Sequence, residues 1–144
     1  MKTIDLRLDE VLLLLVELEG FRKPDTGEVI LKGFINQTLP LKEKYWLNKL
    51  INSLTNEKQE IEKLRNQLIE KFGEKDESNS IFIPMMVEGT NEPNPQYLKF
   101  QTEYQELLNE TKTINYKPIS FETLESITTE DTYNLIFKLV EDAE

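Results

Sequence analysis

Apolar residues near the start of the chain recur at the spacing of an α-helix. The members of this stripe are Leu8, Val11, Leu12, Leu15 and Leu18. They predict a helix over residues 9–19 that ends at Gly20. Leu13, Leu14 and Val16 widen the stripe over most of the circumference. Such a helix lies at the centre of a core or against another subunit, so Leu13 and Leu14 are candidate partner contacts.

The segments on either side of this helix favour short strands. Residues 2–8 alternate between polar and apolar side chains, which permits a strand. After the helix, Pro24, Asp25 and Gly27 form a turn signal. We therefore expect residues 28–35 to form one strand of a small hairpin.

The strongest pattern predicts a long helix over residues 40–72. Pro40 suits the first helical turn and Gly73 suits the C-terminal cap. The apolar positions that keep a seven-residue rhythm are Leu47, Leu50, Leu54, Ile61, Leu64 and Leu68, with Glu57 as the one defect. Residues 55–60 contain no apolar side chain, so the helix either passes through solvent there or breaks at a cap formed by Asn56. We expect a continuous helix of about 50 Å.

An irregular segment with one apolar run follows the long helix. The run comprises Ile81, Phe82, Ile83, Pro84, Met85, Met86 and Val87. Pro84 has no backbone N–H, which restricts the run to an edge strand or an extended arm. An arm would dock onto another chain by strand addition. We expect Ile81, Phe82, Ile83, Met85 and Met86 to be candidate interface residues, because exposed apolar patches of this size usually mark an interaction site.

The last third of the chain predicts short helices and one strand. Asn94 and Pro95 mark the start of a helix that runs to about residue 109. Residues 111–117 alternate as a strand that Pro118 stops. Ser120 caps a helical turn over 121–126, and Thr128 with Asp131 forms a capping box for a final helix over 129–142.

These elements predict a mainly α fold. A long helix (about 40–72) packs with an N-terminal helix and two C-terminal helices, and a small β element comprises about residues 28–35, 81–87 and 111–117. We expect residues 1–144 to form a single domain with an irregular arm or loop at 74–96, since 144 residues and 17.0 kDa suit one domain.

The composition of the chain excludes several kinds of functional site. The chain has neither cysteine nor histidine, which excludes disulfides, thiolate metal sites and thiol nucleophiles. It also removes the usual side chain for proton transfer near pH 7. We therefore expect a protein that is not an enzyme and needs no cofactor.

The net charge of −10 is uneven along the chain. Residues 1–72 carry twelve basic and twelve acidic side chains, whereas residues 73–144 carry five and fifteen. Because no segment has a basic excess, direct nucleic-acid binding and attraction to anionic membranes are disfavoured. We also expect no membrane span and no signal peptide, which makes the cytoplasm the default compartment.

Carboxylates at helical spacing are a weak candidate metal site. Glu103, Glu106 and Glu110 could hold Mg²⁺ or Mn²⁺, but a solvated polar face explains them more simply. Residues 76–80 resemble the start of a calcium loop, yet Ile81 replaces the glycine and Val87 the glutamate of that loop. We expect no metal at either place.

Tyr45 and Trp46 lie side by side in the sequence near the start of the long helix. Large aromatic side chains can anchor a partner. They also commonly pack over the core of their own domain. Both readings remain open, and Tyr45 and Trp46 are candidate interface residues.

Four segments resemble small, largely uncharacterised helical proteins from the virion-morphogenesis region of tailed bacteriophages. They are KYWLNKL (44–50), LRNQLIEKFGEKDE (64–77), FQTEYQELL (100–108) and ISFETLE (119–125). In that family a long helix precedes an irregular segment, a shorter helix, a strand and a short helical element; here Phe72 replaces a tyrosine. The resemblance covers about residues 40–140. It implies a role in the virion or its assembly and no catalytic residues.

The leading hypothesis is a non-enzymatic bacteriophage virion or assembly protein of the head, neck or tail. Its expected partners are further copies of the chain or other phage structural proteins, in the host cytoplasm or the virion. One alternative is an acidic inhibitor of a host DNA-binding or defence enzyme. A third hypothesis is a metal-dependent hydrolase that uses the carboxylates of α-helical residues 103, 106 and 110.

Overall fold

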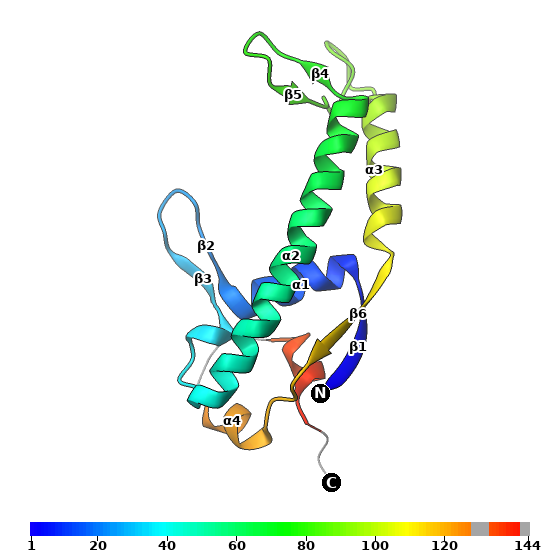
Figure 1. The fold of residues 1–144 in the computed structure, drawn as a ribbon. Coiled ribbons are helices and arrows are strands. Elements are labelled where there is room, and N and C mark those ends of the chain that lie inside the picture. Colours follow the sequence, from blue (N-terminus) through cyan, green and yellow to red (C-terminus); the bar gives the residue numbers. More distant parts are fainter. Residues whose placement is uncertain (128–132, 142–144) are drawn as a thin grey trace. The chain divides into compact units, whose positions relative to one another are not determined.

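The computed structural model describes residues 1–127 and 133–141 and divides the chain into two compact units. Unit 1 comprises residues 1–58 and 111–144, and unit 2 comprises residues 59–110. One helix, α2 (Leu41–Phe72), contributes to both units. It is continuous through residues 55–60, as the sequence predicts (Figure 1).

The N-terminal strand of unit 1 pairs with a strand more than a hundred residues away. β1 (Lys2–Arg7) and β6 (Thr111–Tyr116) form an antiparallel ladder in which Lys2 is opposite Tyr116 and Arg7 is opposite Thr111 (Figure 1). Because alternate side chains of a strand share a face, Leu6 and Ile114 are both buried.

A mostly buried helix follows β1 directly. In α1 (Leu8–Glu19) the carboxylate of Glu10 accepts the backbone N–H of Arg7 at 3.1 Å, which closes the first turn. This hydrogen bond is the main reason that the pKa of Glu10 is lowered, and Lys138 contributes to the same shift. The core of unit 1 gathers around α1 and comprises Leu6, Val11, Leu14, Leu15, Leu18, Phe34, Leu47, Leu50, Leu54, Ile114, Tyr116, Ile119, Tyr133, Leu135, Ile136 and Leu139.

A small hairpin and a 3-10 turn connect α1 to α2. β2 (Gly20–Arg22) and β3 (Val29–Lys32) pair antiparallel, with a bulge between Phe21 and Arg22. At the base of the hairpin Gly33 passes close to α1, because a Cβ on Gly33 would lie 2.3 Å from the carbonyl carbon of Glu19. The next residues form η1 (Phe34–Asn36), which places Phe34 in the core.

The first part of α2 packs against the rest of unit 1 through Leu47, Leu50 and Leu54. The rhythm of this stripe is interrupted at Glu57. Its carboxylate pairs with the ammonium group of Lys112 on β6 at 3.3 Å. The position that interrupts the heptad pattern therefore carries an ion pair at the edge of the core.

The C-terminal part of unit 1 contains two short helical elements. Ser120 caps α4 (Phe121–Ser126), where its hydroxyl accepts the N–H of Thr123. Residues 133–141 contain η2 (Ile136–Leu139). This segment is fastened to α1, since the carboxylate of Glu17 accepts the N–H of Leu135 at 3.0 Å.

Unit 2 is built on a helical pair with a small core. Residues 59–72 of α2 are followed by β4 (Glu74–Lys75), β5 (Ile81–Phe82) and α3 (Pro95–Leu108). The side chain of Asn94 caps α3 by accepting the N–H of Gln96 at 3.0 Å. Among the described residues of unit 2, Ile61, Phe100 and Leu108 are buried. Tyr104 stacks on Phe100, with ring centroids 5.8 Å apart.

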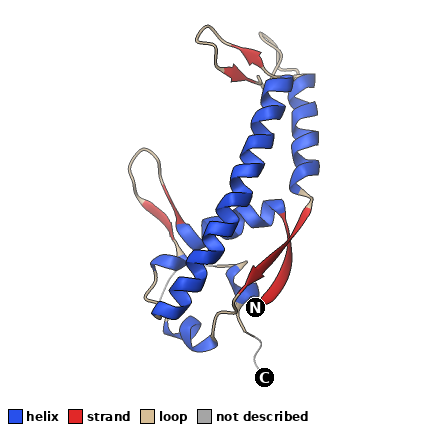
Figure 2. Cartoon of the chain, in the orientation of Figure 1, coloured by secondary structure: helices blue, strands red, loops and turns tan. Residues whose placement is uncertain are grey.

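The prediction of a mainly α fold is wrong. The described part of the chain is 52% helical and 20% strand, with four α-helices and three antiparallel sheets of two strands (Figure 2). The predicted strand 28–35 ends at Lys32, because Phe34 turns into the core. The predicted strand 81–87 ends at Phe82, shortly before Pro84. Strand 111–117 ends at Tyr116.

The predicted final helix over 129–142 is also not found where it can be assessed. Residues 129–132 and 142 lie outside the described residues. Within 133–141 the 3-10 turn η2 is the helical element, and it is followed by a parallel bridge between Val140 and Ile119. Leu135, Ile136 and Leu139 are buried, whereas Phe137 is exposed. A 3-10 turn has three residues per turn, so it directs a different set of side chains inward than the predicted α-helix would.

Candidate functional site

The apolar run 81–87 ends in a cluster of exposed side chains in unit 2. Ile81 and Phe82 pair with β4, and Ile83 is half-buried. The side chain of Phe82 is nevertheless exposed. Met85 is 60% exposed, and Met86 and Val87 are also exposed. All the interface candidates of this run except Ile81 and Ile83 are therefore accessible to a partner.

Backbone hydrogen bonds hold the loop that presents these side chains. The N–H of Val87 donates to the carbonyl of Glu92 at 2.9 Å, and the N–H of Asn94 donates to the carbonyl of Met85 at 3.0 Å. The side-chain amide of Asn94 also donates to the carbonyl of Pro84 at 2.8 Å. The loop closes on itself and on the cap of α3, so Met85 and Met86 lie on a folded platform.

The segment that carries this loop is acidic. Residues 74–94 carry five acidic side chains and one basic side chain. Glu77, Glu88 and Glu92 are exposed, and none of them forms an ion pair within the described parts of the chain. We call the set Phe82, Met85, Met86, Val87, Glu88 and Glu92 the acidic loop surface.

The remaining acid of this region, Asp76, is engaged by its own loop. Its Oδ1 accepts the hydroxyl of Ser78 at 2.8 Å, and the N–H groups of Ser78 and Ser80 at 2.9 Å. The hydroxyl of Ser78, followed by the N–H of Ser80, holds the pKa of Asp76 below its ordinary value. The polar groups of the calcium-like sequence thus form a tight turn.

A second exposed surface, in unit 1, lies on the first turns of α2. Tyr45 is 54% exposed and contacts Trp46 edge-to-face, with ring centroids 5.3 Å apart. The ammonium group of Lys49 lies 5.4 Å from the ring of Tyr45, and that of Lys117 lies 5.2 Å from the ring of Trp46. Tyr45 therefore faces outward, Trp46 is half-buried, and each has a cation near its ring, whereas neighbouring Leu47 is buried.

The charge of this second surface is basic. Leu41, which is exposed, and Lys42 lie on the same side of α2 as Tyr45, at helical spacing. Lys42 has no ion-pair partner among the residues that the structure describes. We call the set Leu41, Lys42, Tyr45, Trp46, Lys49 and Lys117 the basic helix surface. The sequence analysis identified its aromatics but missed its lysines, although their spacing along the helix was visible.

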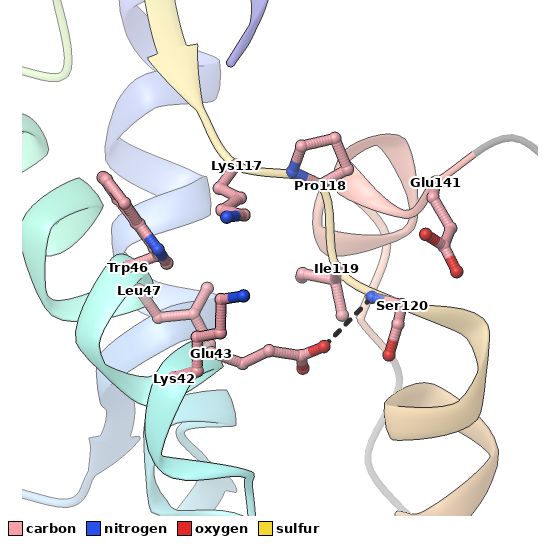
Figure 3. Close-up of a pocket in the computed structure, with 9 residues that line it drawn as sticks. All are labelled: Lys42, Glu43, Trp46, Leu47, Lys117, Pro118, Ile119, Ser120 and Glu141. Carbon is pink, nitrogen blue, oxygen red and sulfur yellow. Dashed lines mark hydrogen bonds between the residues drawn. The ribbon is translucent and has the colours of Figure 1, made fainter.

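A pocket of about 230 Å³ adjoins the basic helix surface (Figure 3). Its apolar walls include Trp46, Leu47 and Ile119, and Lys117 lies at its edge. Glu43 points from α2 toward the start of α4. One oxygen of its carboxylate accepts the N–H of Ser120 at 3.3 Å. The other oxygen is buried and has no hydrogen-bond partner within the described residues.

The remaining N-terminal candidates divide between core and surface. Leu14 is 0% exposed and belongs to the core, so it is not available to a partner. Leu13, one position away, is 49% exposed. Successive residues of a helix point about 100° apart, which separates the two. The hairpin β2–β3 also exposes Phe21, Val29 and Ile30, which the sequence analysis did not single out.

Glu103 and Glu106 of α3, with Glu110 just after the end of that helix, line a groove in unit 2 together with side chains of α2. Within it the ammonium group of Lys71 pairs with Glu103 at 3.3 Å. Over residues 1–127 and 133–141, no group of three or more Asp or Glu side chains is placed to hold a metal ion. The groove therefore lies between α2 and α3, and the ion pair of Lys71 with Glu103 crosses it.

None of the described helices is both long enough and apolar enough to cross a membrane. The bacteriophage resemblance stays a prediction drawn from residues 40–140. Comparison of the chain with protein-family models, curated proteins and solved structures gives no match.

Proposed function

We propose that this chain is a non-enzymatic protein that acts through protein–protein contacts, as a small component or assembly factor of a bacteriophage head, neck or tail. The observation that supports it most is the acidic loop surface. There, methionine, phenylalanine and valine side chains are exposed on a backbone that its own hydrogen bonds hold in place.

Exposed apolar groups on an ordered loop favour a binding role for a physical reason. Apolar area in contact with water costs about 25 cal/mol per Å² relative to burial. A loop that is already ordered loses little conformational entropy when a partner covers it. Methionine adapts its shape to the surface it meets. Met85 and Met86 therefore suit a docking surface better than a solvent-facing turn.

The assignment to a bacteriophage particle rests on the sequence resemblance over residues 40–140. Its order of elements, a long helix, an irregular segment, a shorter helix, a strand and a short helical element, agrees with α2, the loop 73–94, α3, β6 and α4.

Site-specific cross-linking tests this proposal. A photo-activated amino acid replaces Met85, and in a matched control it replaces Gln101, an exposed polar residue of α3. Both variants are produced during assembly of the phage that encodes the chain. We expect strong cross-links from position 85, either to one defined particle protein or to the chain itself, and weak ones from position 101. Particles that assemble normally without the chain, and equal background cross-linking from both positions, would contradict the proposal.

A further inference from the structure

The two exposed surfaces of the chain have complementary chemistry. The acidic loop surface presents flexible apolar side chains among carboxylates. The basic helix surface presents aromatic side chains among ammonium groups. Contacts between methionine sulfur and aromatic rings are favourable, and opposite charges steer such surfaces together.

The charges on both surfaces are left without ion pairs in the described parts of the chain. Glu88 and Glu92 have no ion pair, and the same holds for Lys42. Two acids lie beside the outward lysines: Glu43 turns inward and accepts the N–H of Ser120, and Glu141, which also lines the pocket, accepts the N–H of Phe121. Residues 59–110 carry eleven acidic and five basic side chains, so unit 2 is clearly acidic.

We propose that the acidic loop surface of one copy docks onto the basic helix surface of a second copy. This deepens the proposed function, on which it rests, by naming the partner as the chain itself. Each chain would use two different surfaces, which makes the contact heterologous. Contacts of this type build closed rings or open filaments, as in the stacked parts of a particle.

The pocket beside Trp46 supplies a receptor for one apolar side chain. Its volume of about 230 Å³ exceeds the roughly 150 Å³ of an apolar cavity that holds benzene. The side chain of Met85, the most exposed of the loop's apolar residues, is of suitable size and polarity for the walls formed by Trp46 and Ile119. Insertion of one anchor into a pocket is the usual arrangement at the centre of an interface.

Pairing of two identical surfaces is disfavoured by electrostatics. Two acidic loop surfaces would bring Glu88 and Glu92 of one copy against the same carboxylates of the other. Two basic helix surfaces would oppose their lysines. Like charges at an interface suppress association, so only the unlike pair is favourable.

Sedimentation velocity of the purified full-length chain tests the proposal. We expect the wild-type mass to rise from 17.0 kDa as the protein concentration increases at low salt. About 1 M salt, where the Debye length is about 3 Å, should weaken this association. The double variant Lys42→Glu with Lys49→Glu, and the double variant Met85→Asp with Met86→Asp, should each remain at the monomer mass.

The matched control reverses two lysines outside both surfaces, Lys63→Glu with Lys99→Glu, which are exposed in the structure. It should associate as the wild type does. Circular dichroism of all three variants checks folding, because every substituted side chain is exposed and none should unfold the chain. Loss of association in the control as well would overturn the proposal, since net charge alone would then explain the effect.

A mixture of the two surface variants tests whether the contact joins two unlike surfaces or two identical ones. In the mixture, one chain keeps its acidic loop surface and the other keeps its basic helix surface. These can form one contact, and the two altered surfaces that remain are both acidic. We expect a 1:1 complex of twice the monomer mass that does not grow further. A mixture that stays monomeric, or that forms larger species, would overturn the proposal.

A wild-type chain that stays at the monomer mass up to millimolar concentration would overturn self-association and leave the proposed function standing. Cross-linking from position 85 would then identify a different particle protein. The proposed function fails separately, if position 85 shows no specific partner and particles assemble without the chain.

Discussion

The hydroxyl of Tyr133 forms two hydrogen bonds in unit 1, and the cost of losing them can be worked out. Tyr133 is 4% exposed and packs edge-to-face on Phe34, with ring centroids 5.5 Å apart. Its hydroxyl donates to the backbone carbonyl of Lys32 at 2.6 Å and accepts the side-chain amide of Gln37 at 3.0 Å. The two hydrogen bonds connect the C-terminal segment to the hairpin and to the end of η1.

The substitution Tyr133→Phe removes both hydrogen bonds and keeps the ring. Each bond contributes about 0.5–1.5 kcal/mol, and a buried polar group left without a partner costs about 1–3 kcal/mol. Gln37 is buried, so its amide would be such a group. We expect the free energy of unfolding of unit 1 to fall by about 2–3 kcal/mol, which lowers Tm by roughly 10 °C or more.

Urea titration followed by tryptophan fluorescence measures this change. Trp46 is the single tryptophan and belongs to unit 1, so its signal reports on that unit. The control is Tyr116→Phe, because Tyr116 is buried to a similar degree and its hydroxyl has no hydrogen bond to any residue that the structure describes. It should lose less than about 0.5 kcal/mol. Equal losses in the two variants would refute the reasoning.

Three further predictions concern backbone packing, a loop carboxylate and the stability of unit 2. Gly33→Ala should cost roughly 3–5 kcal/mol in a urea titration, because its Cβ would meet the backbone of Glu19. Gly27→Ala, at a φ of +72° with nothing within 4 Å, should cost only about 1–2 kcal/mol. Since the folded pKa of Asp76 is lowered, the turn it holds should be intact above the ordinary aspartate pKa and be lost as the pH falls through the folded value. An NMR titration of the Ser78 amide should therefore have its midpoint below that of aspartate in a peptide, and a midpoint at or above it would contradict the assignment. Hydrogen exchange should be faster in α3 than in α1, because few side chains are buried in unit 2, and equal protection would argue against this.

Helix positions with local signals were predictable from the sequence. Asn94 before Pro95 marks the start of α3, and Ser120 marks the start of α4, because a cap needs only residues two or three positions away. The continuity of α2 through residues 55–60 was also predicted. Its polar stretch carries good helix formers, and the break at Asn56 does not occur.

The strands and part of the candidate site were not predictable in the same way. β4 and β5 have two residues each, too few for a periodic pattern. The sequence left open whether the apolar run ending at Val87 forms an edge strand or an arm that docks onto another chain. It did not indicate that Asn94 and Glu92 would fold that run into a platform, since those hydrogen bonds join residues that have no shared pattern.

By itself the sequence determined helices α1 to α4, the absence of thiol and imidazole side chains, and the acidic excess of residues 73–144. The tertiary structure decided which side of each apolar element meets water. Leu13 and Leu14 have the same chemistry, yet one is half exposed and the other is fully buried. Only the pairing of β1 with β6 and the packing of residues 133–141 on α1 settle this. Helix caps depend on neighbours along the chain, whereas burial depends on segments that are distant in sequence and close in space.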